Sequence, residues 1–370
     1  MSAQFNVIAP GVLATIQDIG RSGYRRIGVP QSGALHPDLA YLANALVDNP
    51  VSTAVLEFFL IGPTLQLTEG SAQIALSGDF TAELRRGSKT LPLTSWRSIT
   101  LHAGDLLKIG PLVAGKVGYL AVTGGFRLTP VMGSCSTYLR GEFGGIDGHR
   151  LLAGSRLELL ATSAPQEPDR QLSQSAVAAV PGLIIAAETE GEPHQIRVIW
   201  GPQEDYFTSA ARDLFVRSGY RISRDSDRMG SRLEGTQLDH DPERGSEIIS
   251  DGIVPGAIQV PGNGAPIVLL ADGPTVGGYP KIATVISVDL PILATLQPGR
   301  SICFRAVSTT TAEKLLRHHR QQLAALVEQI VRIATDPVVP TATLNRINLI
   351  SGVVDGRRDS PEVPVTSDGD

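Results

Sequence analysis

The sequence predicts a mainly β protein with a few helices, and two observations carry this prediction. Glycine and proline together make up 39 + 25 = 64 of the 370 residues, about 17%, against about 12% in average proteins. So many turn-forming residues fit short strands and tight turns better than long helices. In addition, short apolar segments recur between turn signals along the chain, a spacing that is typical of β-barrels and sandwiches.

The predicted strands lie in both halves of the chain. They cover residues 65–67, 73–76, 106–109, 117–122, 196–200, 267–270, 284–288 and 302–307. Aromatic residues are only 5% of the chain, so we expect aliphatic side chains to fill the core.

One phrase, Leu-x-(Ala/Pro)-Gly followed by alternating apolar residues, occurs three times. It covers residues 101–104, 151–154 and 296–299. It predicts a turn whose glycine adopts a positive φ, followed by a half-buried strand. The phrase is either a common turn idiom or a sign of related barrel modules in both halves.

Three segments have the apolar spacing of amphipathic helices: 37–48, 204–217 and 311–334. Pro37 suits the first turn of the first of these. We expect the following organisation: an N-terminal β-barrel half over 1–165, a Ser-, Gln-, Pro- and Glu-rich linker over 166–193, a C-terminal β-barrel half over 194–308, a helical extension over 309–354, and a disordered tail over 355–370.

Composition excludes several classes of protein. The net charge is 32 − 37 = −5, and no basic stripe is present that would bind nucleic acid. No apolar run approaches the roughly 20 residues that a membrane span needs. The first residues lack the basic and apolar regions of a secretory signal, and two cysteines cannot form a disulfide framework. We therefore expect a cytoplasmic protein with no nucleic-acid or membrane partner.

Several motifs come close to known sites without matching them. Residues 110–117 approach a phosphate-binding loop, but Val117 stands where Ser or Thr would hold Mg²⁺, and a β pattern follows instead of a helix. The seven histidines show no paired-ligand spacing, so we predict no metal site. No Ala-Met-Lys-Met segment is present, so we expect no biotin attached to this chain.

Three polar, glycine-rich loops are the candidates for a ligand site. Residues 133–145 offer hydroxyls, backbone amides and Arg140, which can bind a carboxylate or phosphate. Residues 271–281 follow an apolar strand, where ligand sites tend to lie, although a packed turn with an incidental ion pair remains an alternative. Residues 16–24 and 28–34 are dense in polar side chains between core elements, and we interpret them as functional, with a surface excursion as the alternative.

These loops carry a family resemblance. Gln17-Asp18-Ile19-Gly20-Arg21 with Ser32-Gly33-Ala34 resembles the opening of the biotin-dependent carboxyltransferase family. That family includes allophanate hydrolase subunit 2, the C-type subunit of 5-oxoprolinase, and the carboxyltransferase region of urea carboxylase. Its other signatures resemble residues 133–141, 227–230, 252–261 and 270–283, so the resemblance covers about residues 12–308.

The resemblance implies a fold and partners. It implies cyclophilin-like β-barrel units in two halves, and an obligate partner related to allophanate hydrolase subunit 1, which corresponds to the B-type subunit of 5-oxoprolinases. With a third, A-type subunit, such an assembly opens 5-oxoproline to glutamate at the expense of ATP; whether this chain itself binds ATP stays open. One alternative is a carboxyltransferase that moves carboxyl from carboxybiotin, carried on another chain, to urea or a similar small amide. Another is a regulator without catalysis that antagonises an inhibitor of histidine kinases.

The resemblance also suggests site residues. We expect Lys281 and Arg140 to polarise a small amide or lactam, with Asp272 or Tyr279 assisting proton movement. The expected substrate-binding residues are Gln17, Asp18, Arg21, Ser32, Gln259 and Thr275.

Two positions depart from the family pattern. His36 stands where the family usually has Asp, and Pro274 replaces a glutamine. The carboxylate of the family's Asp, and the side-chain and backbone donors of its Gln, are therefore missing here.

Overall fold

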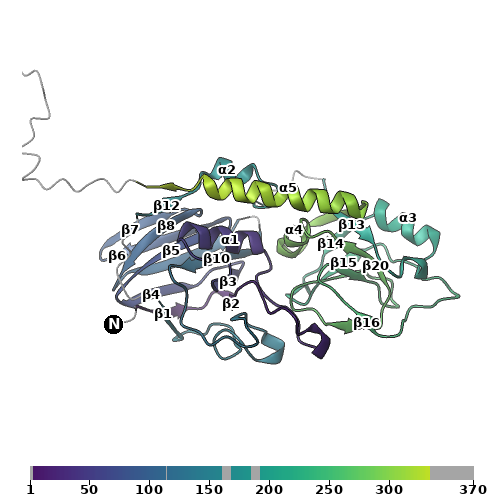
Figure 1. Ribbon diagram of the computed structural model, residues 1–370, viewed down its shortest axis with the longest axis horizontal. Helices are drawn as coiled ribbons and strands as arrows, with labels where there is room; N and C mark the ends of the chain where they lie inside the picture. Colours follow the sequence, from purple (N-terminus) through teal and green to yellow (C-terminus); the bar gives the residue numbers. More distant parts are fainter. Residues whose placement is uncertain (1–2, 114, 161–167, 185–191, 334–370) are drawn as a thin grey trace, which may run out of the picture. The chain divides into compact units, whose positions relative to one another are not determined.

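A computed structural model describes residues 3–113, 115–160, 168–184 and 192–333. Met1–Ile333 form one compact unit, and the fold is mainly β (Figure 1), as predicted. The predicted tail over 355–370 and the last part of the predicted helical extension lie outside the described residues. None of the described helices is long and apolar enough to cross a membrane.

The strands of the N-terminal half form two sheets (Figure 1), and two short strands from later in the chain, β12 (Arg170–Gln171) and β22 (Val331–Arg332), extend the second. In sheet order, the first contains β11 (Arg156–Glu158), β1 (Gln4–Ala9), β4 (Thr64–Glu69), β9 (Leu106–Leu112), β6 (Phe80–Arg86) and β7 (Lys89–Leu93). The second contains β2 (Val12–Gln17), β3 (Val55–Phe59), β10 (Val117–Val122), β5 (Ser71–Ser77), β8 (Arg97–His102), β12 and β22.

The two N-terminal sheets pack against each other around a shared apolar core. Phe5 and Leu65 of the first sheet and Leu56 and Leu120 of the second belong to one buried cluster. Both sheets are open, because the outermost strands of each do not pair with each other among the described residues. The prediction of a barrel in this half is therefore not met, and the half is two stacked sheets, the other architecture that short strands favour.

The C-terminal half is a closed barrel of seven strands. In order around the barrel they are β13 (His194–Trp200), β20 (Lys281–Val285), β17 (Ala257–Gln259), β18 (Ile267–Leu269), β15 (Gly230–Gly235), β14 (Gly219–Ile222) and β21 (Ser301–Ala306). β13 and β21 pair in parallel and close the barrel. A separate two-stranded antiparallel sheet of β16 (Asp251–Gly252) and β19 (Val276–Gly277) lies outside it.

The helices partly follow the sequence pattern. They are α1 (Pro37–Leu46), α2 (Gln174–Ala178), α3 (Ser209–Arg217), α4 (Leu290–Thr295) and α5 (Thr309–Glu328), with the 3-10 turns η1 (Arg25–Ile27), η2 (Leu139–Gly141) and η3 (Glu204–Tyr206). α1 confirms the prediction over 37–48. α5 starts two residues earlier than the predicted 311 because Ser308 caps it, accepting a hydrogen bond from the amide of Thr311. It ends at Glu328, short of the predicted 334, and Val331–Arg332 pair as the strand β22 instead of continuing the helix.

The helix predicted over 204–217 is broken in two. Phe207 adopts an extended conformation after η3, and the Thr208 hydroxyl then caps α3 by accepting a hydrogen bond from the amide of Ala211. The apolar spacing continues across the break because Phe207 and Phe215 are both buried in the same core.

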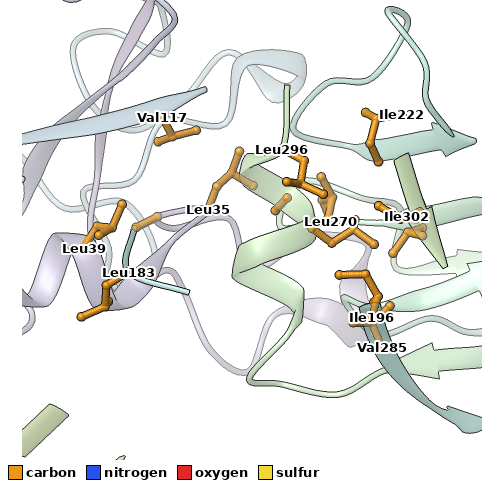
Figure 2. Close-up of a cluster of buried hydrophobic side chains, with 14 of the residues drawn as sticks. Leu35, Leu39, Val117, Leu183, Ile196, Ile222, Leu270, Val285, Leu296 and Ile302 are labelled. Carbon is orange, nitrogen blue, oxygen red and sulfur yellow. The ribbon is translucent and has the colours of Figure 1, made fainter. Parts of the chain in front are cut away.

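A second apolar core runs from the N-terminal half into the barrel. The same buried cluster contains Leu39 of α1, Val117 of β10, and the barrel residues Ile196 and Ile302, which Figure 2 labels. Leu35 and Leu270 also belong to it (Figure 2). The segment between β2 and α1 is therefore anchored to the barrel by apolar packing.

The repeated Leu-x-(Ala/Pro)-Gly phrase is confirmed as a turn. Gly104, Gly154 and Gly299 all have positive φ, and each precedes a strand, namely β9, β11 and β21. Because two of these strands are in an open sheet and one is in the barrel, the phrase marks turns and not a barrel module.

Candidate functional site

The site begins with a charged residue in an otherwise apolar strand. In β3 the side chains alternate, so that Leu56 and Phe58 enter the core between the sheets while Val55 and Phe59 enter the second core. Glu57 shares the second face and is fully buried. Tyr119 lies opposite it on β10 and donates its hydroxyl hydrogen to Glu57 Oε2 at 2.7 Å.

Arg228 supplies the positive charge that this buried carboxylate needs. It lies in the turn between β14 and β15, where Asp227 Oδ1 accepts hydrogen bonds from the amides of Met229 and Gly230. Its guanidinium donates to Glu57 Oε1 through Nη1 and to both oxygens of Asp272, through Nε at 2.8 Å and Nη2 at 3.2 Å. Two carboxylates therefore share one buried cation.

The electrostatics of this group favour its charged form. Burial alone would lower the pKa of Arg228, but Asp272 and Glu57 more than offset burial and raise it. Burial, with the charge of Glu57, raises the pKa of Tyr119 well above its usual value. Arg228 thus stays protonated, and Tyr119 stays a neutral donor.

A second network is centred on Asp18, directly after β2. Its Oδ1 accepts hydrogen bonds from the hydroxyls of Ser134 at 2.6 Å and Ser136 at 2.5 Å, and from the amide of Gly20 at 2.8 Å. Its Oδ2 accepts from the amide of Cys135 at 2.6 Å. Asp18 therefore joins the candidate loops 16–34 and 133–145, and its carboxylate is used to fix the backbone of residues 134–136.

Arg21 is buried beside this network with unused donors. Its Nη2 donates to the carbonyl oxygen of Ser136, and its guanidinium lies 4.8 Å from the centre of the Phe143 ring. Burial lowers its pKa, opposed by Asp18 and Asp272. Its Nε and Nη1 have no hydrogen-bond partner among the described residues, nor does Gln17 Oε1. These loops therefore keep spare hydrogen-bonding capacity, which is unusual for buried groups.

A cavity of about 330 Å³ lies between the loop that precedes α1 and the barrel. Residues 31–35 form one wall, and 270–271 with parts of 285–294 form the other. Ser32 has a φ of 56°, is only 6% exposed, and its Oγ has no partner in the described part of the chain. A strained backbone and an unpaired hydroxyl at a cavity wall are features of ligand-binding residues.

Lys281, Tyr279 and Gln259 form a separate group on the barrel. Lys281 begins β20 and its Nζ lies 2.7 Å from Asp251 Oδ2 in β16. The Gln259 amide donates to the carbonyl oxygen of Tyr279 at 3.4 Å, and the Tyr279 side chain is exposed. None of these three is among the described residues that line the 330 Å³ cavity.

Neither Arg140 nor Thr275 lines the 330 Å³ cavity. Arg140 is exposed, and its Nη1 lies 3.4 Å from the sulfur of Met229. Thr275 is buried, and its carbonyl oxygen accepts from the amide of Ile253. Burial raises the pKa of Tyr138, with Asp272 acting in the same direction and Arg140 against it. Arg140 and Asp272 therefore both act electrostatically on Tyr138.

Asp272 and Lys281 have different partners, Arg228 and Asp251. An ion pair between Asp272 and Lys281, the alternative explanation for the loop 271–281, is not formed. Asp18 and Ser32 line the cavity, and Asp272 follows Ala271 in its wall, while Lys281, Tyr279 and Gln259 lie on the barrel wall. Gln17 and Arg21 contact the 133–145 loop instead, through the carbonyl oxygens of Thr137 and Ser136.

Comparison with known proteins places the chain. Residues 27–306 match the family described as "Carboxyltransferase domain, subdomain A and B". This chain belongs to that carboxyltransferase family. The predicted resemblance is thereby confirmed.

Relatives within the carboxyltransferase family include two bacterial proteins. The chain is 36% identical to the 5-oxoprolinase C subunit of Escherichia coli over 308 residues, which cover 83% of this chain and 93% of that protein. It is 34% identical to the 5-oxoprolinase C subunit of Haemophilus influenzae over 323 residues, covering 87% and 96%.

A solved carboxyltransferase-family structure also resembles the chain. The crystal structure of the Kluyveromyces lactis urea carboxylase superposes with a TM-score of 0.77 at 28% identity. The match covers 92% of this chain but only 30% of that much longer one.

The carboxyltransferase signatures alone do not point to the centre of the network. Arg228 falls within the 227–230 signature without a role of its own, and Glu57 and Tyr119 lie outside every signature. A signal for Glu57 is nevertheless present, because it is the one charged residue within Val55-Leu56-Glu57-Phe58-Phe59. A charge in so apolar a strand needs a buried partner.

The two family departures lie beside the network. His36 donates its backbone N–H to the Tyr119 hydroxyl oxygen at 2.9 Å, and its imidazole Nε2 lies 3.1 Å from the carbonyl oxygen of Gly182. Burial lowers the pKa of His36, which favours a neutral ring. Pro274 lines a smaller cavity of about 270 Å³ together with Arg140 and Met229.

Proposed function

We propose that this chain is the C-type subunit of an ATP-dependent 5-oxoprolinase, which with partner subunits opens 5-oxoproline to glutamate. The observation that carries the proposal is the match to two 5-oxoprolinase C subunits, at 36% and 34% identity over 93% and 96% of their lengths. A match over almost the whole relative supports a shared role within such an enzyme, and not a borrowed domain.

The cavity between residues 31–35 and the barrel is the proposed substrate pocket. A lactam needs a donor for its carbonyl oxygen and an acceptor for its N–H, set among apolar walls. The Ser32 hydroxyl is buried and unpaired among the described residues, and it can serve either role. Leu35, Leu270 and Pro291 supply apolar contacts in the same cavity.

Arg140, Lys281 and Tyr279 do not line this pocket, and the roles proposed for them rest on the family resemblance. Arg140, exposed beside Met229, is proposed to bind the substrate carboxylate as a bidentate donor. Lys281 is proposed to stabilise negative charge that develops as the ring opens. Tyr279 is proposed to assist proton movement, and Asp272, held by Arg228, to orient the substrate amide.

The segment that approaches a phosphate-binding loop in sequence, residues 110–117, fits ATP poorly. Residues 110–117 join β9 to β10 with no helix following, and Lys116 is only 4% exposed. A phosphate-binding loop needs a following helix and an accessible lysine. We assign ATP binding to an A-type or B-type partner, and derive no step through ATP on this chain.

A second candidate function is carboxyl transfer from carboxybiotin to urea or a similar amide. The similarity to the Kluyveromyces lactis urea carboxylase favours it. Biotin would then be carried on another chain. We also propose, from the family resemblance, that the closed barrel is a cyclophilin-like unit.

The test is co-expression of this chain with its A-type and B-type partners, followed by an assay of ATP-dependent glutamate release from 5-oxoproline. We expect turnover by the assembled complex and none when this chain is left out. An assembled complex that does not turn over 5-oxoproline, but carboxylates urea when given carboxybiotin on a carrier protein, would replace the first function with the second.

A further inference from the structure

One side chain contacts both walls of the proposed substrate pocket. Arg228 donates from Nη2 to the carbonyl oxygen of Gly33 at 2.7 Å, in the wall formed by residues 31–35. It donates from Nε to Asp272 at 2.8 Å, and Asp272 directly follows Ala271 in the opposite wall. A further bond goes to Glu57.

Glu57, which accepts from Arg228, also binds the first wall, formed by residues 31–35. Its Oε2 accepts from the amide of Leu35 at 2.8 Å, in addition to the Tyr119 hydroxyl. The backbone of Asp272 also donates to the carbonyl oxygen of Arg228 at 3.0 Å. The walls share one direct backbone bond, from the amide of Ser32 to the carbonyl oxygen of Ala271 at 3.1 Å. The side-chain hydrogen bonds that hold them together meet at one guanidinium.

We propose that Arg228 is a positioning residue that sets the separation of the two pocket walls, and through it the fit of the substrate. This inference rests on the function proposed above. Arg228 is 4% exposed on its side chain and is not among the described residues that line the cavity. It acts on substrate only through Gly33, Glu57 and Asp272.

The contact pattern requires arginine. Four donated hydrogen bonds leave the guanidinium in three directions, which a planar fork with five N–H groups can supply. A lysine keeps the charge, but its single ammonium cannot reach both carboxylates and the Gly33 carbonyl in this geometry. Arg228→Lys therefore tests position with charge held constant.

The experiment compares Arg228→Lys with Arg86→Lys in the assembled complex. Arg86 makes a two-pronged pair with buried Asp105, from Nε to Oδ1 at 3.1 Å and from Nη2 to Oδ2 at 2.6 Å, far from the pocket in the N-terminal half. Its side chain is 41% exposed. We expect Arg228→Lys to raise KM for 5-oxoproline at least tenfold with KM for ATP unchanged within twofold. Arg86→Lys should change neither. A KM for 5-oxoproline within twofold of wild type in Arg228→Lys overturns the proposal.

Hydrogen exchange of the isolated chain gives a readout that does not depend on activity. Arg228→Lys should speed amide exchange in both segments 32–35 and 270–272, whereas Arg86→Lys should speed it in neither. Glu57→Gln keeps the Arg228–Asp272 pair and should affect segment 32–35 alone, which provides the test if Arg228→Lys does not fold. Unchanged exchange in both segments overturns the positioning role. A wild-type complex that does not turn over 5-oxoproline overturns the proposed function. In that case the hydrogen-exchange result still decides whether Arg228 positions the two walls.

Discussion

Lys281 Nζ lies 2.7 Å from Asp251 Oδ2, so the lysine proposed to act on the substrate is paired with a carboxylate from outside the barrel. Lys281 is buried, whereas the Asp251 side chain is 54% exposed. The lysine is thus held on the barrel wall by a partner that reaches it from solvent.

This asymmetry predicts different effects for the two partners. Lys281→Ala should lower kcat at least tenfold, because it removes the positive charge proposed to stabilise the transition state. Asp251→Asn should keep activity within about threefold, because the amine remains and the Asp251 carboxylate that is lost is largely screened by solvent. Steady-state kinetics of the assembled complex checks both. Equal losses in the two variants would mean that the pair serves structure and not chemistry.

Ser32 combines a strained backbone with an unpaired hydroxyl, and two substitutions separate these features. Ser32→Gly should stabilise the chain by about 1 kcal/mol, since glycine adopts a φ of 56° without strain. Ser32→Ala keeps the strain. Both remove Oγ, so both should raise KM for 5-oxoproline by about tenfold. Urea unfolding and kinetics measure the two effects, and a normal KM in either variant would remove Ser32 from the pocket.

Gly144 is predicted to be essential for space as well as for conformation. A Cβ at this position would lie 2.1 Å from the carbonyl oxygen of Ser136 and 3.0 Å from Arg21 Nη2. Gly133 has a similar positive φ, but a Cβ there would meet nothing within 4 Å. Gly133→Ala should cost about 1 kcal/mol of unfolding free energy, and Gly144→Ala at least about 2 kcal/mol more. Equal costs in denaturant titrations would contradict the crowding at Gly144.

The buried amine of Lys116 should make the free energy of unfolding rise at alkaline pH. Burial lowers its pKa from 10.5 to about 8, and Asp227 and Glu57 only partly oppose this. Between these two values the unfolded chain holds a proton that the folded chain has released, so stability rises with pH across this window, by up to about 3 kcal/mol. Lys116→Met should remove that rise. Urea unfolding at pH 7, 8, 9 and 10 checks it, and parallel pH profiles for the two proteins would show that Lys116 is not responsible.

Local patterns in the sequence predict those features that depend on neighbouring residues. The strand at β10, the positive φ of Gly104 and the apolar face of α1 are examples. Features that depend on distant pairing are not predictable in this way. The closure of the barrel depends on β21 pairing with β13, and whether a set of strands closes cannot be read from any one of them.

In the candidate site, too, local features are predictable from the sequence and long-range contacts are not. The loops around Asp18, Ser32 and Asp272 are recognisable because polar residues and glycines gather there. Their partners are not, because the Arg228 contacts join residues 171 and 44 positions apart in the chain. Lys281 and Asp272 carry opposite charges nine residues apart, yet each has its partner elsewhere, since strand geometry decides which side chains meet.

The parallel pairing of β13 with β21 also has a consequence for synthesis of the chain. The first strand of the barrel is completed by its last, so the barrel cannot close on the ribosome until residue 306 has emerged. A chain that stops before Ser301 would leave β13 paired only with β20 and β14 paired only with β15, so each would have one open edge. Such exposed strand edges invite pairing with other chains, so premature termination in this region should yield aggregates in place of a shortened, working protein.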